Sequence, residues 1–458
     1  MTILSSNPAT EVELARFDPH TAADVDAALD AAVAAQRRWR FRAITERVAL
    51  LRAVARVLRE GRSRYAQLIT SEMGKPITEA EAEIEKCAAT CEHYAEHAPE
   101  YLADRPVRTE TGEAAVLHDP LGVVLAVMPW NYPFWQFFRF AAPALAAGNG
   151  AILKHANNVP QCALAIEEVL QQAGILEGLC RTLLVEVPAV AELIADDRIA
   201  AVTLTGSTEA GAIVAGQAGS ALKKQVLELG GSDPFLVLAD ADIPTAATTA
   251  AKARFINVGQ SCVNAKRFLV EEAVADEFVT AFADAVAALK VGDPADRRTA
   301  IGPMARANLR GALHNQVQRS VEAGATLLTG GEPLQGSGFF YPPTILDHVA
   351  PGMAAFDEET FGPLAAITRV TDAEEAVTLA NRTEFGLGAA VWSSDLDRAR
   401  RIAREIDAGA VFINGMVASE ARLPFGGIKK SGYGRELGAD GIREFVNVKT
   451  LRTGTEKP

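Results

Sequence analysis

The segment Ile199–Gly211, IAAVTLTGSTEAG, has the pattern of a strand that runs into a glycine-containing turn and then into a helix. The same order recurs upstream, where the short apolar runs 123–128 and 150–154 are each followed by a helical segment. Such runs are typical of strands buried on both faces. Strands that alternate with helices predict a parallel sheet with right-handed crossovers, so the chain is expected to adopt an α/β fold.

Gly206 and Ser207 form the turn of this segment. A glycine-containing turn between a strand and a helix places free N–H groups and the positive end of the helix where a phosphate can bind. The signal is weak by itself, because many such turns contain glycine and Gly206-x4-Gly211 does not match the usual dinucleotide fingerprint. A phosphate site and an ordinary turn are both compatible with it.

The composition excludes several classes of protein. The 458 residues suffice for two or three domains at roughly 150 residues each, and 49% hydrophobic with 22% charged residues is ordinary for a soluble globular protein. A net charge of -13 argues against nucleic acid or an anionic membrane as the main partner. No signal peptide is visible, and prolines, glycines and an arginine interrupt the most apolar region, 123–153. Five widely spaced cysteines do not suggest a disulfide framework, so we expect a reduced, cytoplasmic compartment.

The stretch Phe255–Arg267, FINVGQSCVNAKR, places one cysteine, Cys262, among small and polar residues. Gly259 lets the backbone come close to a reacting group, because it carries no Cβ atom. A cysteine used only for packing sits more often in an apolar run. From this stretch alone, a reactive thiol and a buried structural thiol are about equally supported.

Two further residues suggest chemistry around such a thiol. Glu228 lies between two leucines and just before a Gly-Gly pair, where an apolar setting would raise its pKa toward the range of a general base. Asn131 follows a buried strand and has a proline on either side, so its amide could be held as an oxyanion donor, although a turn-forming Asn fits equally well. A thiol with a tuned carboxylate indicates covalent catalysis followed by hydrolysis.

A metal site is a weaker possibility. Cys87 and Cys91 lie four residues apart in a predicted helix, and His93 and His97 are close in sequence. No second group of ligands has a suitable spacing, so we expect no metal.

Three stretches carry a resemblance to a known family: LKHANNVPQCAL at 153–164, VLELGGSDPF at 226–235 and FGGIKKSGYGREL at 425–437. With them the chain resembles the NAD(P)-dependent aldehyde dehydrogenase family, nearly from end to end. It is most similar to the bacterial succinate-semialdehyde dehydrogenase branch.

The resemblance implies a division of the chain into three parts. The family's Rossmann-type cofactor domain would comprise residues 1–104 and 126–229, and its α/β catalytic domain residues 230–415. A small β element of residues 105–125 and 430–458 would join protomers into a homodimer or homotetramer.

The resemblance also implies roles for the catalytic residues. Cys262 would attack the aldehyde carbon, and Asn131 with the backbone N–H of Cys262 would hold the oxyanion. Hydride transfer to the nicotinamide would leave a thioester, and Glu228 would activate the water that hydrolyses it. Glu436 would assist proton transfer.

For the cofactor, the family implies that Lys154 binds the adenosine ribose or its phosphate. The other implied contacts are Gly206 and Ser207 at the pyrophosphate, Glu359 at the nicotinamide ribose, and Phe361 and Trp130 along the cleft. NAD-preferring relatives carry Glu three residues after the lysine, where this chain has Asn157. A carboxylate would repel a 2′-phosphate and a neutral amide would not, so we expect NADP to be preferred, with NAD possible.

Substrate choice is expected to depend on Arg139, which lies in a segment rich in Phe, Trp and Ala. An arginine there is costly unless it meets an anion. In the branch that it resembles, the matching arginine binds the distal carboxylate of the semialdehyde, with Ser419 as a lesser contact here. Pairing with a protein acid is the alternative. Some relatives have a second arginine at the position of Ile256, so a clamp of two arginines is in doubt.

The resulting prediction is oxidation of succinate semialdehyde to succinate with NAD(P). Another short aliphatic aldehyde or semialdehyde is an alternative substrate. A CoA-acylating dehydrogenase is a second alternative, although it would not need Glu228 as a base. A non-catalytic dinucleotide-binding protein is a third, against which the set Asn131, Glu228 and Cys262 argues.

Overall fold

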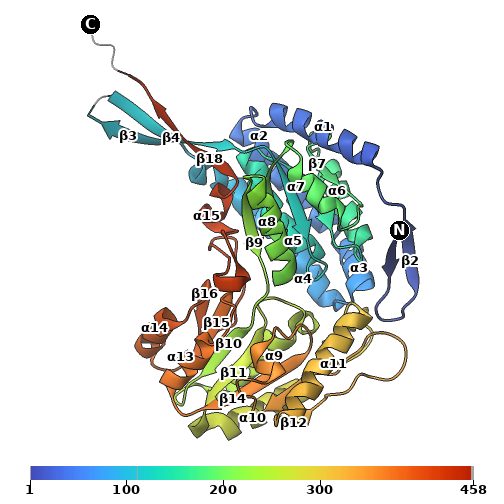
Figure 1. Cartoon of the computed structure of the whole chain (residues 1–458), viewed down its shortest axis with the longest axis vertical. Coiled ribbons are helices and arrows are strands. Elements are labelled where there is room, and N and C mark those ends of the chain that lie inside the picture. Colours follow the sequence, from blue (N-terminus) through green and yellow to red (C-terminus); the bar gives the residue numbers. More distant parts are fainter. Residues whose placement is uncertain (1, 111, 455–458) are drawn as a thin grey trace.

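The computed structural model describes residues 2–110 and 112–454. Residue 111 and residues 455–458, which belong to the expected segments 105–125 and 430–458, lie outside the described residues, as does residue 1. Two large sheets form two halves of the molecule, and a small antiparallel sheet projects away from them (Figure 1). No helix in the described ranges has the length and apolar character needed to cross a membrane.

The first large sheet has six strands in the order β17-β9-β8-β5-β6-β7. Its strands are β5 (Val123–Met128), β6 (Gly150–His155), β7 (Cys180–Thr182), β8 (Ile199–Thr205), β9 (Lys224–Glu228) and β17 (Gly432–Tyr433). All pairs are parallel except that of β17 with β9. The α/β fold expected from alternating strands and helices is confirmed.

Alternation of side chains along β5 explains why both faces of this sheet are covered. Val123 and Leu125 join a core with α1, α7 and α8, whereas Val124 and Ala126 join another with α2 to α6. These helices are α1 (Ala22–Trp39), α2 (Ile44–Glu60), α3 (Arg62–Met73), α4 (Ile77–Tyr101), α5 (Pro133–Ala147), α6 (Pro160–Gln172), α7 (Ala189–Ala195) and α8 (Thr208–Ser220).

The second large sheet has seven strands in the order β12-β13-β14-β11-β10-β15-β16, and only β12 runs antiparallel to its neighbour. They are β10 (Asp233–Val237), β11 (Ala265–Glu271), β12 (Thr326–Thr329), β13 (Thr344–Asp347), β14 (Leu364–Val370), β15 (Gly388–Trp392) and β16 (Ala410–Ile413). The helices of this half are α9 (Ile243–Phe255), α10 (Glu272–Ala287), α11 (Ala307–Glu322), α12 (Ala354–Asp357), α13 (Ala373–Asn381) and α14 (Leu396–Glu405).

The projecting sheet consists of β3 (Arg105–Thr109), β4 (Gly112–Pro120) and β18 (Val446–Arg452), all antiparallel (Figure 1). It therefore joins two segments that are more than 300 residues apart in sequence. Strand β17 and helix α15 (Gly438–Arg443) also lie in the segment 430–458, but β17 pairs with β9 of the first large sheet. A separate two-stranded sheet is formed by β1 (Ile3–Ser6) and β2 (Glu13–Phe17).

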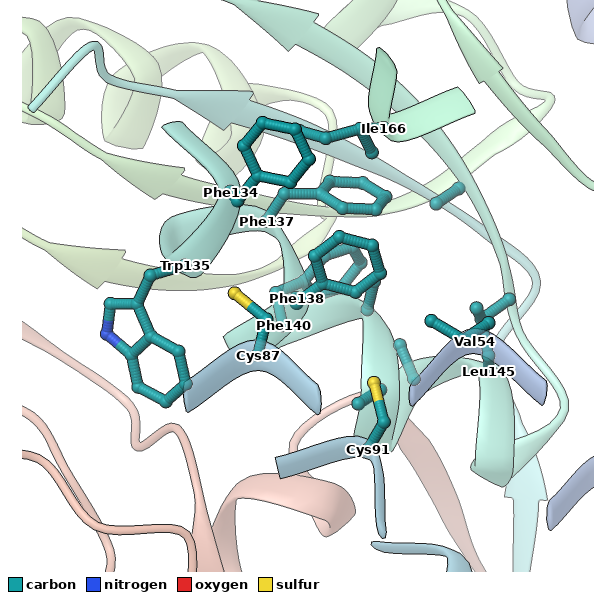
Figure 2. Packing of buried hydrophobic residues seen from close by; sticks show 14 of the residues in the cluster. Val54, Cys87, Cys91, Phe134, Trp135, Phe137, Phe138, Phe140, Leu145 and Ile166 are labelled. Atoms are coloured by element: carbon teal, nitrogen blue, oxygen red, sulfur yellow. The ribbon is translucent and has the colours of Figure 1, made fainter. Parts of the chain in front are cut away.

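Helix α5 is buried along its whole length because almost every residue in it is apolar. Pro133 begins the helix, and Gly148 ends it in a left-handed conformation with φ of 100°. Its phenylalanine rings pack with Cys87 and Cys91 of α4, while the indole of Trp135 lies apart from them at the edge of the cluster (Figure 2). This packing orients the opposite side of the α4–α5 pair toward the candidate site.

Candidate active site

The predicted site residues of the first sheet meet at one edge. Lys154 of β6 and Leu204 of β8 are both paired with Val127 of β5, and Thr205 is paired with Glu228 of β9. The strands are parallel, so their carboxyl ends share this edge, where open α/β sheets bind ligands. Trp130 and Asn131 follow β5 at the same edge, and Gly206 and Ser207 follow β8.

Cys262 lies in the loop between the short 3-10 turn η1 (Ile256–Gly259) and β11. Asn257 and Val258 in this turn have φ of 55° and 58°, a strained region for a β-branched residue. Hydrogen bonds hold the turn against the other sheet: Asn257 Nδ2 donates to Asn131 O at 2.9 Å, and Asn131 Nδ2 donates to Gln260 O at 3.0 Å. The oxyanion donor and the thiol predicted from the sequence are therefore brought together.

The thiol borders a cavity of about 200 Å³. Other residues that line it and bear on its chemistry are Lys86, Tyr132, Trp135, Arg139 and Ser419. Burial raises the pKa of Cys262 to about 12, while the positive charges of Arg139 and Lys266 oppose this shift. A thiol in this setting is protonated at neutral pH and needs a base to become a nucleophile.

Glu228 is buried, and neither of its carboxylate oxygens has a hydrogen-bond partner within the described chain. Burial raises its pKa well above the ordinary value; Arg139 opposes that shift and Glu436 reinforces it. The negative charge of Glu228 in turn reinforces the raised pKa of Cys262. A carboxyl group with a raised pKa and unoccupied oxygens is suited to accept a proton from water.

Arg139 does not present a free guanidinium to the cavity. It forms a buried ion pair with Glu436, donates from Nη2 to Thr205 Oγ1 at 3.3 Å, and stacks 4.9 Å from the centre of the Phe425 ring. Pairing with a protein acid, the alternative stated for this residue, is the arrangement found. Arg139 also lines the cavity, and its role in substrate choice, with Ser419 as a lesser contact, stays a prediction.

A second arginine does not complete a clamp. Arg254 is fully buried, and its hydrogen bonds within the described residues all go to backbone carbonyls, those of Gly259, Thr360, Leu364 and Gly362. Ile256 instead lines the cavity, at the position where some relatives carry arginine.

Lys154 is a buried ammonium at the cofactor edge. Burial lowers its pKa to about 8, and its Nζ donates to Asn157 Oδ1 at 2.9 Å. The side-chain amide of Asn157 is neutral, so it would not repel an additional anion that bound to Lys154. The two residues predicted to choose the cofactor are thus in direct contact.

Gly206 and Ser207 begin helix α8. The Ser207 side chain accepts a hydrogen bond from Ala210 N at 3.2 Å and caps the helix, and Gly206 N donates to Glu228 O at 3.0 Å. Between α7 and α8 lies an open hollow of about 470 Å³, bordered by Ile194 and Ile213. Ile213 is 56% exposed, so the hollow offers an apolar surface that a flat ring could cover.

Glu359, Phe361 and Trp130 lie where the two large sheets face each other. Glu359 accepts hydrogen bonds from Gly231 N at 3.0 Å and from Lys266 Nζ at 3.2 Å. The Trp130 and Phe361 rings meet edge to face with their centres 5.7 Å apart. These contacts link the cofactor edge to the Cys262 loop, because Lys266 Nζ also donates to Cys262 O at 2.9 Å.

Lys266 and Lys86 are two site residues that local sequence motifs did not predict. Lys266 and Arg267 are adjacent charged residues at the start of a strand that is buried at every position, which is a signal for paired or functional groups. Lys86 shares a helix face with Glu79 and Glu83, at spacings of three and seven residues, and that face borders the cavity.

Cys87 and Cys91 lie among aromatic rings, and burial raises the pKa of both thiols (Figure 2). Within residues 2–110 and 112–454, no group of three or more His, Cys, Asp and Glu side chains is placed to hold a metal ion.

Comparison with known proteins agrees with this geometry. The model of the aldehyde dehydrogenase family matches residues 1–451. The chain is 50% identical over 448 residues to the NAD(P)+ succinate semialdehyde dehydrogenase Sad of Escherichia coli (strain K12), covering 98% of this chain and 97% of the relative. It is also 50% identical over 451 residues to a probable NADP(+) succinate-semialdehyde dehydrogenase of Synechocystis sp. (strain ATCC 27184 / PCC 6803 / Kazusa), covering 98% and 99%.

Among solved structures, that of succinic semialdehyde dehydrogenase from Streptococcus pyogenes in complex with NADP+ is similar, with a TM-score of 0.97 and 37% identity. The similarity covers 99% of this chain and 100% of that one. Because the family model spans residues 1–451, and because sequence identity and fold similarity cover nearly the whole chain, the chain belongs to the aldehyde dehydrogenase family.

Proposed function

We propose that the protein oxidises succinate semialdehyde to succinate, with NADP as the preferred cofactor and NAD as a possible one. The observation that carries the proposal is the meeting of Cys262, Asn131 and Glu228 at the cofactor edge, beside a cavity lined by cationic side chains. Relatives that are 50% identical over the full chain and are named as succinate-semialdehyde dehydrogenases support the substrate.

Cys262 Sγ attacks the aldehyde carbon once its proton has been transferred to a base. The Asn131 amide and the backbone N–H of Cys262 stabilise the oxyanion, and a preorganised donor of this kind contributes about 3 kcal/mol. The residues at the cofactor edge would hold NADP, which would supply the acceptor for the hydride. Glu228 then takes a proton from the water that attacks the thioester on Cys262, and the released product is a carboxylate. The charge of Glu436, which is paired with Arg139, reinforces the raised pKa of Glu228, so Glu436 would assist proton transfer at this site.

The residues at the cofactor edge fit a nicotinamide dinucleotide with a 2′-phosphate. Lys154 has no carboxylate within ion-pair distance in the described ranges and would meet the phosphate, while Asn157 adds no repulsion. Gly206, Ser207 and the start of α8 would bind the pyrophosphate, and Ile213 would support the adenine. Glu359, Phe361 and Trp130 would position the nicotinamide half.

We also propose that the protein forms a homodimer or homotetramer through the sheet β3–β4–β18, as expected for the segments 105–125 and 430–458. Val448 and Leu451 support this role, because they are 61% and 53% exposed on β18. The five free cysteines support the reduced, cytoplasmic compartment expected from the sequence. Light scattering of the purified chain would measure the oligomeric state.

Steady-state kinetics test the proposed activity. Succinate semialdehyde, malonate semialdehyde and propanal are compared with NADP and with NAD, each with and without CoA. The highest kcat/KM is expected for succinate semialdehyde with NADP, independent of CoA. A strict requirement for CoA, or a preference for propanal, would contradict the proposal.

A further inference from the structure

The cavity beside Cys262 is bordered by one face of helix α4 that the catalytic steps do not use. Glu79, Glu83 and Lys86 on this face all line the cavity. Their spacing places them on successive turns of one side of the helix. The cavity therefore contains two acidic groups and one basic group in addition to Arg139.

Most of these charges already have a partner. Glu83 forms a buried ion pair with Lys75, and its Oε1 accepts hydrogen bonds from the backbone N–H groups of Phe134 and Trp135 at 2.9 and 3.0 Å. Arg139 is paired with Glu436. Burial raises the pKa of Glu79 to about 7, so this group is largely uncharged in slightly acidic solution.

Lys86 differs from Arg139, the other cation among the residues that line the cavity. No carboxylate oxygen lies within 4.0 Å of its ammonium in the part of the chain that the structure describes. Its Nζ donates to Ser419 Oγ at 2.8 Å and lies 4.2 Å from the centre of the Trp135 ring. An ammonium has three N–H donors, so these two contacts leave capacity for an anion.

We propose that Lys86, together with Ser419, binds the distal carboxylate of the substrate and so selects a semialdehyde over an uncharged aldehyde. The inference rests on the proposed function and assigns its substrate specificity to α4. Arg139 is already paired with Glu436, and its positive charge opposes the rise in the pKa of Cys262. Burial and the charge of Arg139 lower the pKa of Lys86 to about 8, and a bound carboxylate would restore its charged form.

The test compares succinate semialdehyde with its methyl ester, methyl 4-oxobutanoate, which keeps the chain and removes the charge. Lys86→Met keeps the aliphatic stem against Trp135 and removes the ammonium. The KM for succinate semialdehyde is expected to rise about 10- to 100-fold, the effect of one hydrogen bond to a charged group, while the KM for the ester stays within about threefold. Lys86→Arg should restore part of the preference, and Lys290→Met, on the surface in an ion pair with Asp296, serves as the control.

Two results would overturn different parts of this account. Wild-type protein that oxidises the acid and the ester equally well would overturn the proposed substrate, and this inference with it. A wild-type preference that Lys86→Met retains would overturn the assignment of the carboxylate site to Lys86. Ser419→Ala gives a second measurement if Lys86→Met folds poorly: the acid-to-ester ratio of kcat/KM is expected to fall about 3- to 10-fold, and no change would count against the site.

Discussion

Cys262 and Cys87 are two thiols whose pKa is raised by burial, yet only one is placed to react. Cys87 is fully buried among the phenyl rings of α5 (Figure 2). Cys262 borders a cavity and lies near the carboxyl group of Glu228 and the positive charges of Arg139 and Lys266. Desolvation does not by itself turn a thiol into a nucleophile. The thiol also needs access to the substrate and a base that can take its proton.

The boundary between the two environments is a single helix. Cys87 immediately follows Lys86 on α4, but successive residues of an α-helix are rotated by about 100°, so the two side chains face different surroundings. One faces the aromatic core, and the other faces the cavity with Cys262. Core packing on one side of α4 thereby supports the position of charged groups on the other.

The largest effect is expected for Cys262→Ala, which removes the thiol that borders the cavity. Removal of the nucleophile should reduce kcat about 10⁴-fold or more, because no covalent intermediate can form. Production of NADPH from succinate semialdehyde measures the loss. Substantial activity in this variant would show that the thiol is not the reacting group.

Glu228→Gln tests whether a nearby base distinguishes Cys262 from Cys87. We expect kcat to fall about 10²- to 10⁴-fold, the usual contribution of a general base, with hydrolysis of the thioester affected more than its formation. Stopped-flow mixing should therefore show a burst of NADPH close to one equivalent per site, followed by slow turnover. Loss of the burst together with turnover would mean that Glu228 is needed before the hydrolytic step.

The raised pKa of Glu228 also predicts a pH dependence. The acid must lose its proton to act as a base, so kcat of the wild type should rise as the pH increases toward this pKa. The effect of pH on the stability of the fold has the opposite sign to its effect on kcat. A folded-state pKa above the ordinary 4.5 stabilises the fold below pH 4.5, and this contribution is lost as the pH rises toward the folded-state pKa. Glu228→Gln should therefore gain thermal stability relative to the wild type at pH 8 but not at pH 4; an equal difference at both values would contradict this.

Asn157→Glu tests the contact between Asn157 and Lys154 at the cofactor edge, a polar setting that differs from the aromatic core around Cys87. A carboxylate beside Lys154 would repel a 2′-phosphate, so the KM for NADP should rise at least about tenfold while that for NAD falls or stays the same. Separate titrations with the two cofactors measure the change. Asn308→Glu, at an exposed position on α11, is the control and should leave both KM values unchanged.

The smallest effect is expected for Cys87→Ala, which tests the thiol in the aromatic core instead of the thiol that borders the cavity. The variant loses packing in the aromatic core and should be destabilised by about 1 kcal/mol, with kcat/KM unchanged. Chemical denaturation measures the first quantity and steady-state kinetics the second. A large loss of activity without unfolding would show that Cys87 contributes to the reaction.

The sequence alone was sufficient for the α/β class, and it indicated candidate site residues at the ends of strands. Buried parallel strands leave continuous apolar runs, and each run ends where the polar residues of the edge begin, as with 123–128 before Trp130 and Asn131. Cys262 and Glu228 were recognisable because each is a reactive group in an unusual local setting. The sequence therefore determined which residues are at the strand ends.

Tertiary structure alone decided which of the charged side chains at the site pair with each other. Arg139 and Glu436 are nearly 300 residues apart, and no local pattern indicates that they form an ion pair. Lys86 and Ser419 are 333 residues apart, and they meet only because α4 and the loop before Phe425 border the same cavity. Ion pairing acts over a few ångströms between groups brought together by packing, so the residue left free to bind a substrate carboxylate is determined by the fold, not by local sequence.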